Sequence, residues 1–171
     1  MNQDRRNSLK PYCGGMEIRD ATVEDASAAC EVMRRSIAEL CVADHGNDPE
    51  ILTRWLRNKT PEGFMSWLAQ PRNNVLVAVN GSNILAVGAV TDAGEINLNY
   101  VSPDARFRGV SRALLGALET RATELGNKRC VLTSTTTAHR FYKANGYADD
   151  GREDEDDGRT PGYLMSKPLT A

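Results

Sequence analysis

The segment that decides the fold reads Val101-Ser-Pro-Asp-Ala-Arg-Phe-Arg-Gly-Val-Ser-Arg-Ala-Leu-Leu115. It follows a strand-like run, residues 95–101, and opens a run with apolar residues at helical spacing, residues 110–118. Backbone N–H groups in the first turn of a helix lack helical partners and carry partial positive charge. A strand, an Arg-rich loop with one Gly and a helix start therefore predict an anion-binding site here.

The length, composition and net charge of the chain limit the kind of protein that it can be. With 171 residues, 40% of them hydrophobic, it has the size of one domain with a real core. A formal net charge of −2 creates no overall field that would attract nucleic acid or an anionic membrane. The sequence shows neither a run long and apolar enough to span a membrane nor the apolar core of a secretory signal at its N-terminus. We therefore expect a cytoplasmic protein that binds neither nucleic acid nor membrane.

Local start signals place the elements before residue 70. The polar residues 1–15 end in Gly14-Gly15 and predict a flexible leader, outside a single domain of residues 16–171. A strand begins at Met16. A capping box at Thr22 opens a helix that runs to about Cys41. Proline at a first helical position predicts two further short helices, from residue 49 and from residue 61.

The rest of the chain predicts mainly strands. Residues 74–79 and 83–90 are joined by Asn80-Gly81, a strong hairpin signal, and strand 95–101 follows. After the helix of residues 109–125, strand 128–134 returns through a helical crossover and should lie parallel to strand 95–101. A helix at 136–145, a strand from Tyr147 and a strand at 162–167 follow. The acidic residues 149–157 predict an exposed hairpin loop, with contact to a cationic substrate as the alternative.

Cysteine and histidine spacing argues against a metal site. The four cysteines are far apart and form no C-x-x-C pair, and the two histidines are not spaced as ligands with them. We expect buried free thiols, and no metal, rather than disulfides or a metal centre. These residues are Cys13, Cys30, Cys41, Cys130, His45 and His139.

The order of elements over residues 16–167 resembles the GNAT superfamily of N-acyltransferases. The most specific part is Arg106-x-x-Gly109-x-Ser111 after Pro103, which is similar to the family's acyl-CoA pyrophosphate signature, with Ser111 at a position that is usually Gly or Ala. The resemblance implies an α/β fold with a mixed, mostly antiparallel, splayed sheet flanked by helices. It implies acetyl-CoA as co-substrate and direct acetyl transfer to an amine of a small molecule or peptide. Relatives are often dimers, so a homodimer is also an expectation.

The pyrophosphate of CoA needs several converging N–H donors more than any one side chain. By the resemblance, the backbone of the loop and first helical turn supplies them, and three arginines add local positive charge. The candidate cofactor-binding residues are Arg106, Phe107, Arg108, Gly109, Val110, Ser111 and Arg112.

A second motif, from Ala138 through Phe141-Tyr142 to Gly146, is also similar to a GNAT segment. In that segment the tyrosine is the general acid that protonates the departing CoA thiolate, which makes Tyr142 our candidate catalytic acid. The alternative is an aromatic residue that only packs beside Phe141. Thr135 stands where the family often has an Asn that contacts the pantetheine arm, and we include it among the cofactor-binding candidates.

The strand of residues 95–101 carries the remaining candidates. Some relatives have a glutamate base at the position of Glu95, so Glu95 is a candidate catalytic base, and a solvent-facing strand end is the alternative. Strand alternation would put it on one face with Asn97 and Asn99. The resemblance also implies that a bulge splays this strand from its neighbour. There the backbone N–H groups of Tyr100 and Val101 would bind the pantetheine amides and the oxyanion.

The acceptor pocket is the part that motifs describe least. The loop of residues 43–48, with Asp44 and His45, lies where the family shapes this pocket, although a surface-loop histidine without a further role is the alternative. Glu95 and the acidic run favour a cationic amine. A function of another class, a non-catalytic acyl-CoA sensor or interaction module, would need the phosphate loop but neither an acid nor a base.

Overall fold

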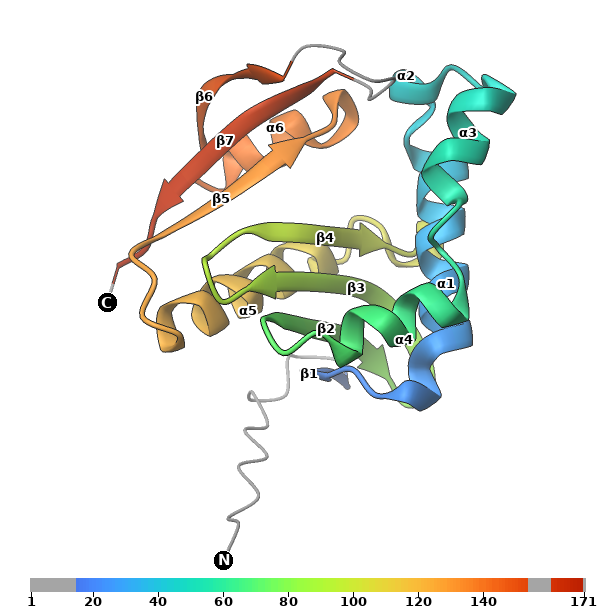
Figure 1. Cartoon of the computed structure of the whole chain (residues 1–171), viewed down its shortest axis with the longest axis horizontal. Coiled ribbons are helices and arrows are strands. Elements are labelled where there is room, and N and C mark those ends of the chain that lie inside the picture. Colours follow the sequence, from blue (N-terminus) through green and yellow to red (C-terminus); the bar gives the residue numbers. More distant parts are fainter. Residues whose placement is uncertain (1–14, 154–160, 171) are drawn as a thin grey trace, which may run out of the picture.

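The computed structural model describes residues 15–153 and 161–170 (Figure 1). Strands and helices alternate with three short non-α helical turns, labelled η. In chain order the elements are β1 (Met16–Asp20), η1 (Val23–Asp25), α1 (Ala26–Arg35), η2 (Ser36–Leu40), α2 (Val42–His45), α3 (Pro49–Leu56), α4 (Pro61–Ala69), β2 (Asn73–Asn80), β3 (Asn83–Thr91), β4 (Ile96–Val101), η3 (Pro103–Ala105), α5 (Val110–Glu124), β5 (Arg129–Ser134), α6 (Thr136–Ala144), β6 (Ala148–Glu153) and β7 (Gly162–Pro168).

The first four strands form one sheet, and the last three strands form a second sheet. Strands β1-β2-β3-β4 make an antiparallel sheet, and β5-β7-β6 make a second antiparallel sheet. One parallel bridge, Glu95 to Val131, joins β5 to the start of the β4 segment, with Val131 N donating to Gly94 O at 3.0 Å. The predicted parallel direction is therefore confirmed, but the pairing is confined to this bridge. Beyond it the two strands diverge (Figure 1).

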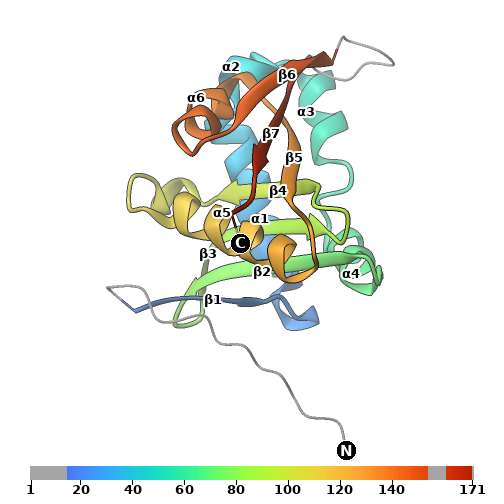
Figure 2. The ribbon, with the colours of Figure 1, turned by 90° about the vertical axis from the view of Figure 1, so that its left-hand side faces the viewer.

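Helices cover both faces of the four-stranded sheet. Figure 2 shows α5 on one face and α1 on the other. On the α5 side, Leu114 and Leu118 pack so closely on β3 that a Cβ at Gly88 would come within 2.8 Å of Leu118. On the opposite face, Met33 of α1 and Phe64 of α4 are fully buried. The mixed α/β fold with flanking helices and a splayed sheet is thus confirmed.

The first long helix differs from the prediction. Its start is as expected, because Asp25 Oδ2 accepts a hydrogen bond from Thr22 N at 2.8 Å and from Arg19 at 2.8 Å. The α-helix, however, ends at Arg35, and the chain continues as the π-helical turn η2. Such turns are often found at functional sites, and two residues of η2 line the cavity described below.

The predicted loop of residues 43–48 contains the short helix α2. The interpretation of His45 as a surface residue is wrong, because its side chain is 1% exposed. Its Nε2 donates to Ile37 O at 2.9 Å, and its Nδ1 accepts from Asn47 N at 3.0 Å. The ring lies edge-on to Trp55, with centroids 6.2 Å apart. The helical turn directs the imidazole inward, where these contacts satisfy both nitrogens.

The acidic run is also different from the expected loop. The strand predicted from Tyr147 is confirmed, but it runs further than expected: β6 pairs with β7 as far as Glu153 and so includes Asp150 as well as Asp149. Asp149 lies 2.7 Å from His139 Nε2 and 3.2 Å from Lys143 Nζ of α6. Residues 154–157 of the run and the predicted leader before Gly15 lie outside the described residues. Within those residues, no helix combines the length and apolar character that crossing a bilayer requires.

Candidate active site

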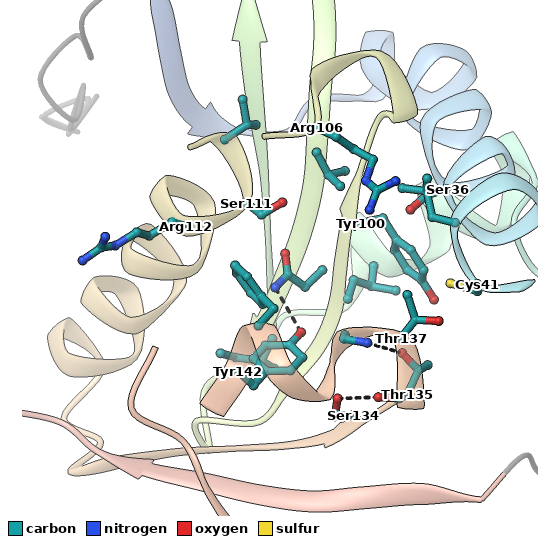
Figure 3. Close-up of a pocket in the computed structure, with 18 of the residues that line it drawn as sticks. Ser36, Cys41, Tyr100, Arg106, Ser111, Arg112, Ser134, Thr135, Thr137 and Tyr142 are labelled. Carbon is teal, nitrogen blue, oxygen red and sulfur yellow. Dashed lines mark hydrogen bonds between the residues drawn. The ribbon is translucent and has the colours of Figure 1, made fainter. Parts of the chain in front are cut away.

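A cavity of about 410 Å³ occupies the space where β4 and β5 diverge (Figure 3). Its walls come from η2, β4, the loop before α5 with the first turn of that helix, the end of β5, and α6 from Thr137 to Tyr142. Segments more than 100 residues apart in the chain therefore meet here. The cavity contains residues from both sequence motifs, which confirms that the fold brings the two motifs together.

The loop between η3 and α5 presents backbone donors to this cavity. Phe107 has a φ of 59° and Gly109 a φ of 78°, so the chain turns through two left-handed residues before the helix begins. The first helical backbone bond runs from Ala113 N to Gly109 O at 3.0 Å. The amides of residues 110–112 therefore precede the helical ladder and are free to bind an anion.

The loop side chains are mostly exposed. Phe107 is 93% exposed, and the Arg106 guanidinium carbon lies 4.5 Å from its ring centroid. In Figure 3, Arg106 turns toward Ser36 of η2, and Arg112 extends away from the cavity. Every predicted residue from 106 to 112 lines the cavity except Arg108. The helix start, more than a ring of arginine side chains, therefore makes this end of the cavity suitable for an anion.

Strand β4 contains the expected irregularity. The β3–β4 register shifts between Ala89 and Val90, which leaves Asn97 as an extra residue. Ile96 consequently packs into the core beneath α5, whereas Leu98 and Tyr100 pack toward α1 and α4. The prediction that Glu95 shares a face with Asn99 is therefore wrong, because the bulge at Asn97 reverses the alternation of side chains between these two residues.

The open edge of β4 offers amides to the cavity. Ser102 N donates to Leu85 O at 2.8 Å, and hydrogen-bonded pairs alternate along an antiparallel ladder. By this alternation the amide of Tyr100 faces β3, and the amides of Asn99 and Val101 face away from it, toward the gap. Of the two predicted amide donors, the register thus directs Val101 to the cavity and Tyr100 to the neighbouring strand. The second backbone amide that faces the cavity is that of Asn99 and not that of Tyr100.

Tyr142 lies at the centre of the site. It is buried, and its hydroxyl accepts a hydrogen bond from Asn99 Nδ2 at 3.0 Å. Burial raises the pKa of Tyr142 to about 12, and the Asn99 hydrogen bond opposes this change. The phenol therefore keeps its proton at neutral pH. Its ring packs edge-on against Phe141 and Tyr147, so the packing interpretation and the acid interpretation are compatible.

Thr135 lines the cavity and also caps α6. Its Oγ1 accepts a hydrogen bond from Ala138 N at 3.2 Å, and its carbonyl accepts one from Ser134 Oγ at 2.8 Å. The capping bond uses the hydroxyl oxygen as acceptor, so its proton remains available as a donor.

Glu95 does not reach this site. It precedes β4, its side chain is exposed, and it is absent from the cavity wall. Its backbone instead closes the turn before β4, with Thr91 N donating to Glu95 O at 2.9 Å. The structure therefore brings Tyr142 and the α5 start together and leaves Glu95 outside.

Two features of the cavity have no signal in the sequence. Asn99 lies on a strand whose polar residues were expected on one face, but no local signal indicates its contact with Tyr142. Cys41 lines the cavity next to η2, and burial raises the pKa of its thiol to about 11. Cys130, by contrast, is fully buried outside the cavity wall. Within the described residues Cys30, Cys41 and Cys130 are free thiols, and Cys13 lies outside them.

Comparison with known proteins agrees with this geometry. Residues 41–161 match the family model described as an acetyltransferase (GNAT) domain. The chain is 29% identical over 137 residues to an amino-acid acetyltransferase of Azotobacter vinelandii (strain DJ / ATCC BAA-1303), a match that covers 80% of this chain and 28% of that protein. The chain thus spans less than a third of the length of that relative.

Solved structures show the same fold. A GCN5-related N-acetyltransferase of Rhodopseudomonas palustris superposes with a TM-score of 0.80 at 22% identity, over 97% of this chain and 100% of that one. The PaiA N-acetyltransferase of Thermoplasma acidophilum, solved in complex with coenzyme A, superposes with a TM-score of 0.74 at 20% identity, over 90% and 98%. From the match over residues 41–161 and this shared architecture, we conclude that the chain belongs to the family of GNAT acetyltransferase domains.

Proposed function

We propose that this domain binds acetyl-CoA and passes the acetyl group directly to an amine of a small molecule or peptide. One observation carries the proposal: a single cavity connects the free amides at the start of α5 with the buried phenol of Tyr142. A donor with an anionic group at one end and a reactive thioester at the other fits this arrangement. The coenzyme A bound to the Thermoplasma relative supports the same ligand class.

The residues present fit such a donor. The amides of residues 110–112, with the neighbouring Arg106 side chain, would hold the pyrophosphate. The amides of Asn99 and Val101 would hold the pantetheine arm along the edge of β4 and donate hydrogen bonds to the thioester carbonyl oxygen as it gains negative charge. Acetyl-CoA supplies the activated acyl group, and the protein supplies position, hydrogen bonds and a proton.

Tyr142 is the proposed general acid. Because its hydroxyl oxygen accepts from Asn99 Nδ2, its own proton is free to move to the departing sulfur. A protonated cavity thiol would be a poor nucleophile, and the raised pKa of Cys41 keeps that thiol protonated at neutral pH. Direct transfer, without an acyl-cysteine, is therefore the reaction that this site supports. Replacing Cys41 by Ser should leave acetyl transfer intact.

The acceptor amine must also lose a proton. Among the described residues that line the cavity there is no carboxylate, so transfer to Glu95 requires a relay through water. Glu95→Gln tests this role. If Glu95 is the base, this variant should lose most of its turnover. Unchanged turnover would show that Glu95 takes no part in the mechanism.

The first experiment is acetyl-CoA titration by calorimetry, followed by an amine panel that includes amino acids, because the matched Azotobacter protein is named an amino-acid acetyltransferase. Products are identified by mass spectrometry. We expect acetyl-CoA binding and at least one acetylated amine, with turnover that depends on Tyr142. Binding without any acetylated amine, and no effect of Tyr142→Phe, would favour the acyl-CoA sensor instead. Failure to bind acetyl-CoA would overturn the proposal.

A further inference from the structure

The N-terminus of α6 is capped by a residue from a distant part of the chain. Asp44 Oδ1 accepts a hydrogen bond from Thr136 N at 2.6 Å, and Asp44 Oδ2 accepts from Thr137 N at 3.1 Å and from the Thr137 hydroxyl. Thr135 satisfies the next amide, that of Ala138. A carboxylate is the favoured partner at this end of a helix, because it meets both the free amides and the positive end of the helix dipole.

Asp44 is itself firmly held. It belongs to α2, which is fixed by the buried ring of His45 through its bond to Ile37 O of η2 and its edge-on packing on Trp55 of α3. Gly46 follows in the left-handed conformation and ends the helix. The Asp44 carboxylate therefore connects a rigid group of elements, η2, α2 and α3, to the start of α6. We name the Asp44 bonds to Thr136 and Thr137 the α2–α6 clasp.

The clasp links α6, which lines the active-site cavity, to η2, which lines another wall and is held to α2 through His45. Ser36 and Leu40 of η2 line one wall, and Thr137 and Tyr142 of α6 line the other. Strands β4 and β5 are tied together only at Glu95–Val131 within the described part of the chain, so nothing in the sheet holds these walls together at the divergent end. Figure 1 shows α2 at that end of the molecule.

We propose that Asp44 is a positioning residue that sets the separation of η2 and α6, and with it both the placement of Tyr142 and the size of acceptor that can enter. Asp44 is outside the cavity wall and acts from behind it, through α6. The effect on catalysis rests on the proposed function, but the effect on the cavity does not. The loop of residues 106–112 belongs to a different wall, so acetyl-CoA binding should be independent of the clasp.

Asp48 provides a matched control. It is also the N-cap of a helix, accepting from Glu50 N at 2.8 Å and from Ile51 N at 3.3 Å. It lies four residues from Asp44 and caps its own helix, α3. Asp48→Ala should therefore cost a similar amount of stability as Asp44→Ala without releasing α6.

Alkylation of Cys41 can measure how far the cavity opens, and it does not require that the acceptor be known. Its thiol lines the cavity on the η2 side. Because the Asp44 charge also raises the pKa of Cys41, a single alkylation rate would mix opening with thiolate content. The ratio of the rates for a bulky reagent, fluorescein-5-maleimide, and a small one, N-ethylmaleimide, cancels the thiolate fraction. Site-resolved mass spectrometry of the full chain gives both rates at Cys41 and, as a reference for unfolding, at the fully buried Cys130.

We expect Asp44→Ala to raise the bulky-to-small ratio at Cys41 about five- to tenfold, the population shift expected from loss of a helix cap. Asp48→Ala should leave that ratio unchanged, and Cys130 should stay unreactive in both variants. Equal changes in the two variants, an unchanged ratio in Asp44→Ala, or parallel labelling of Cys130 would each overturn the proposal.

Turnover and binding form the second arm. With an acceptor from the amine panel, Asp44→Ala should lower kcat about 10- to 100-fold, as small misplacements of reacting groups do, and leave the acetyl-CoA dissociation constant within twofold. An acetyl-CoA affinity that falls together with kcat would show general damage and contradict the positioning role. If wild-type protein does not bind acetyl-CoA but the Cys41 ratio changes as expected, the proposed function fails and the clasp stands.

Discussion

Asn99 of β4 donates a hydrogen bond to the hydroxyl of Tyr142 in α6, with a nitrogen–oxygen distance of 3.0 Å. The two residues are 43 positions apart: Asn99 lies in the first sheet, and Tyr142 lies in the helix that follows β5 of the second. Because the hydroxyl oxygen is the acceptor of this bond, the hydroxyl proton of Tyr142 is free to be donated to another group. The bond also explains why a buried tyrosine, with a pKa raised to about 12, is stable in this position.

Tyr142→Phe should lower kcat about 10²- to 10⁴-fold, the usual contribution of a general acid, because only the proton donor is removed. Acetyl-CoA affinity should change little, since the ring remains in its packing against Phe141 and Tyr147. Tyr147→Phe is the matched control, because Tyr147 is also buried but its hydroxyl donates to Glu119 Oε1 at 3.0 Å. Steady-state kinetics and calorimetry check both. Similar kcat values for the two variants would contradict the acid role.

Replacement of Asn99 should affect the same step through Tyr142. In Asn99→Ala the phenol loses the hydrogen bond that lowers its pKa, becomes a weaker acid and transfers its proton more slowly. We expect a fall in kcat of about tenfold, in line with the loss of one hydrogen bond. Acetyl-CoA affinity should be retained, because the proposed contact uses the Asn99 backbone. Asn97→Ala, in the bulge of the same strand, should leave kcat unchanged. An equal loss in both variants would show that the strand, not the Asn99 side chain, is responsible.

The loop before α5 should be sensitive to its backbone. Gly109 has a φ of 78°, a conformation that costs a residue with a Cβ about 1–2 kcal/mol. Gly109→Ala should therefore raise the acetyl-CoA dissociation constant about tenfold or more. Gly116→Ala, within α5 and with open space around its Cβ position, should stabilise the helix by about 1 kcal/mol and leave binding unchanged.

The same titrations include Arg108→Ala. Arg108 does not line the cavity, so its loss should weaken binding less than Gly109→Ala does. If Arg108→Ala is the more damaging change, side-chain charge and not the backbone amides dominates anion binding at this loop.

Stability should fall in alkaline solution, in part through Cys130. Burial raises the pKa of this thiol to about 11, against an ordinary value of about 8.5. Since the folded state holds a proton that the unfolded state releases, the stabilisation is complete below about pH 8.5 and is lost between there and about pH 11. The free energy of unfolding can be measured with urea under reducing conditions at pH 8, 9 and 10. In this window it should fall less steeply with pH for Cys130→Ala than for the wild type, by about 1.4 kcal/mol per pH unit. Parallel declines would show that Cys130 ionises equally in both states.

Most of the fold could be predicted because it depends on local chemistry. The hairpin at Asn80-Gly81 and the proline-led helices each express a conformational preference of the residues themselves. The predictions that were wrong concern residues whose neighbours come from elsewhere. His45 is buried by contacts with η2 and α3, and residues 150–153, expected in a loop, belong to β6 because they follow its pairing with β7.

The sequence by itself identified the proposed anion site at residues 106–112 and the candidate acid Tyr142, because each depends on a motif and its local conformation. Only the tertiary structure decided which other backbone and side-chain groups lie beside the helix start and Tyr142. The bulge at Asn97 and the register of β4 direct the amides of Asn99 and Val101 to the cavity, and the divergence of β4 from β5 creates it. Asn99, Cys41 and the Asp44 clasp became visible only there, because long-range packing, and not sequence spacing, sets the distance between the two halves of the sheet.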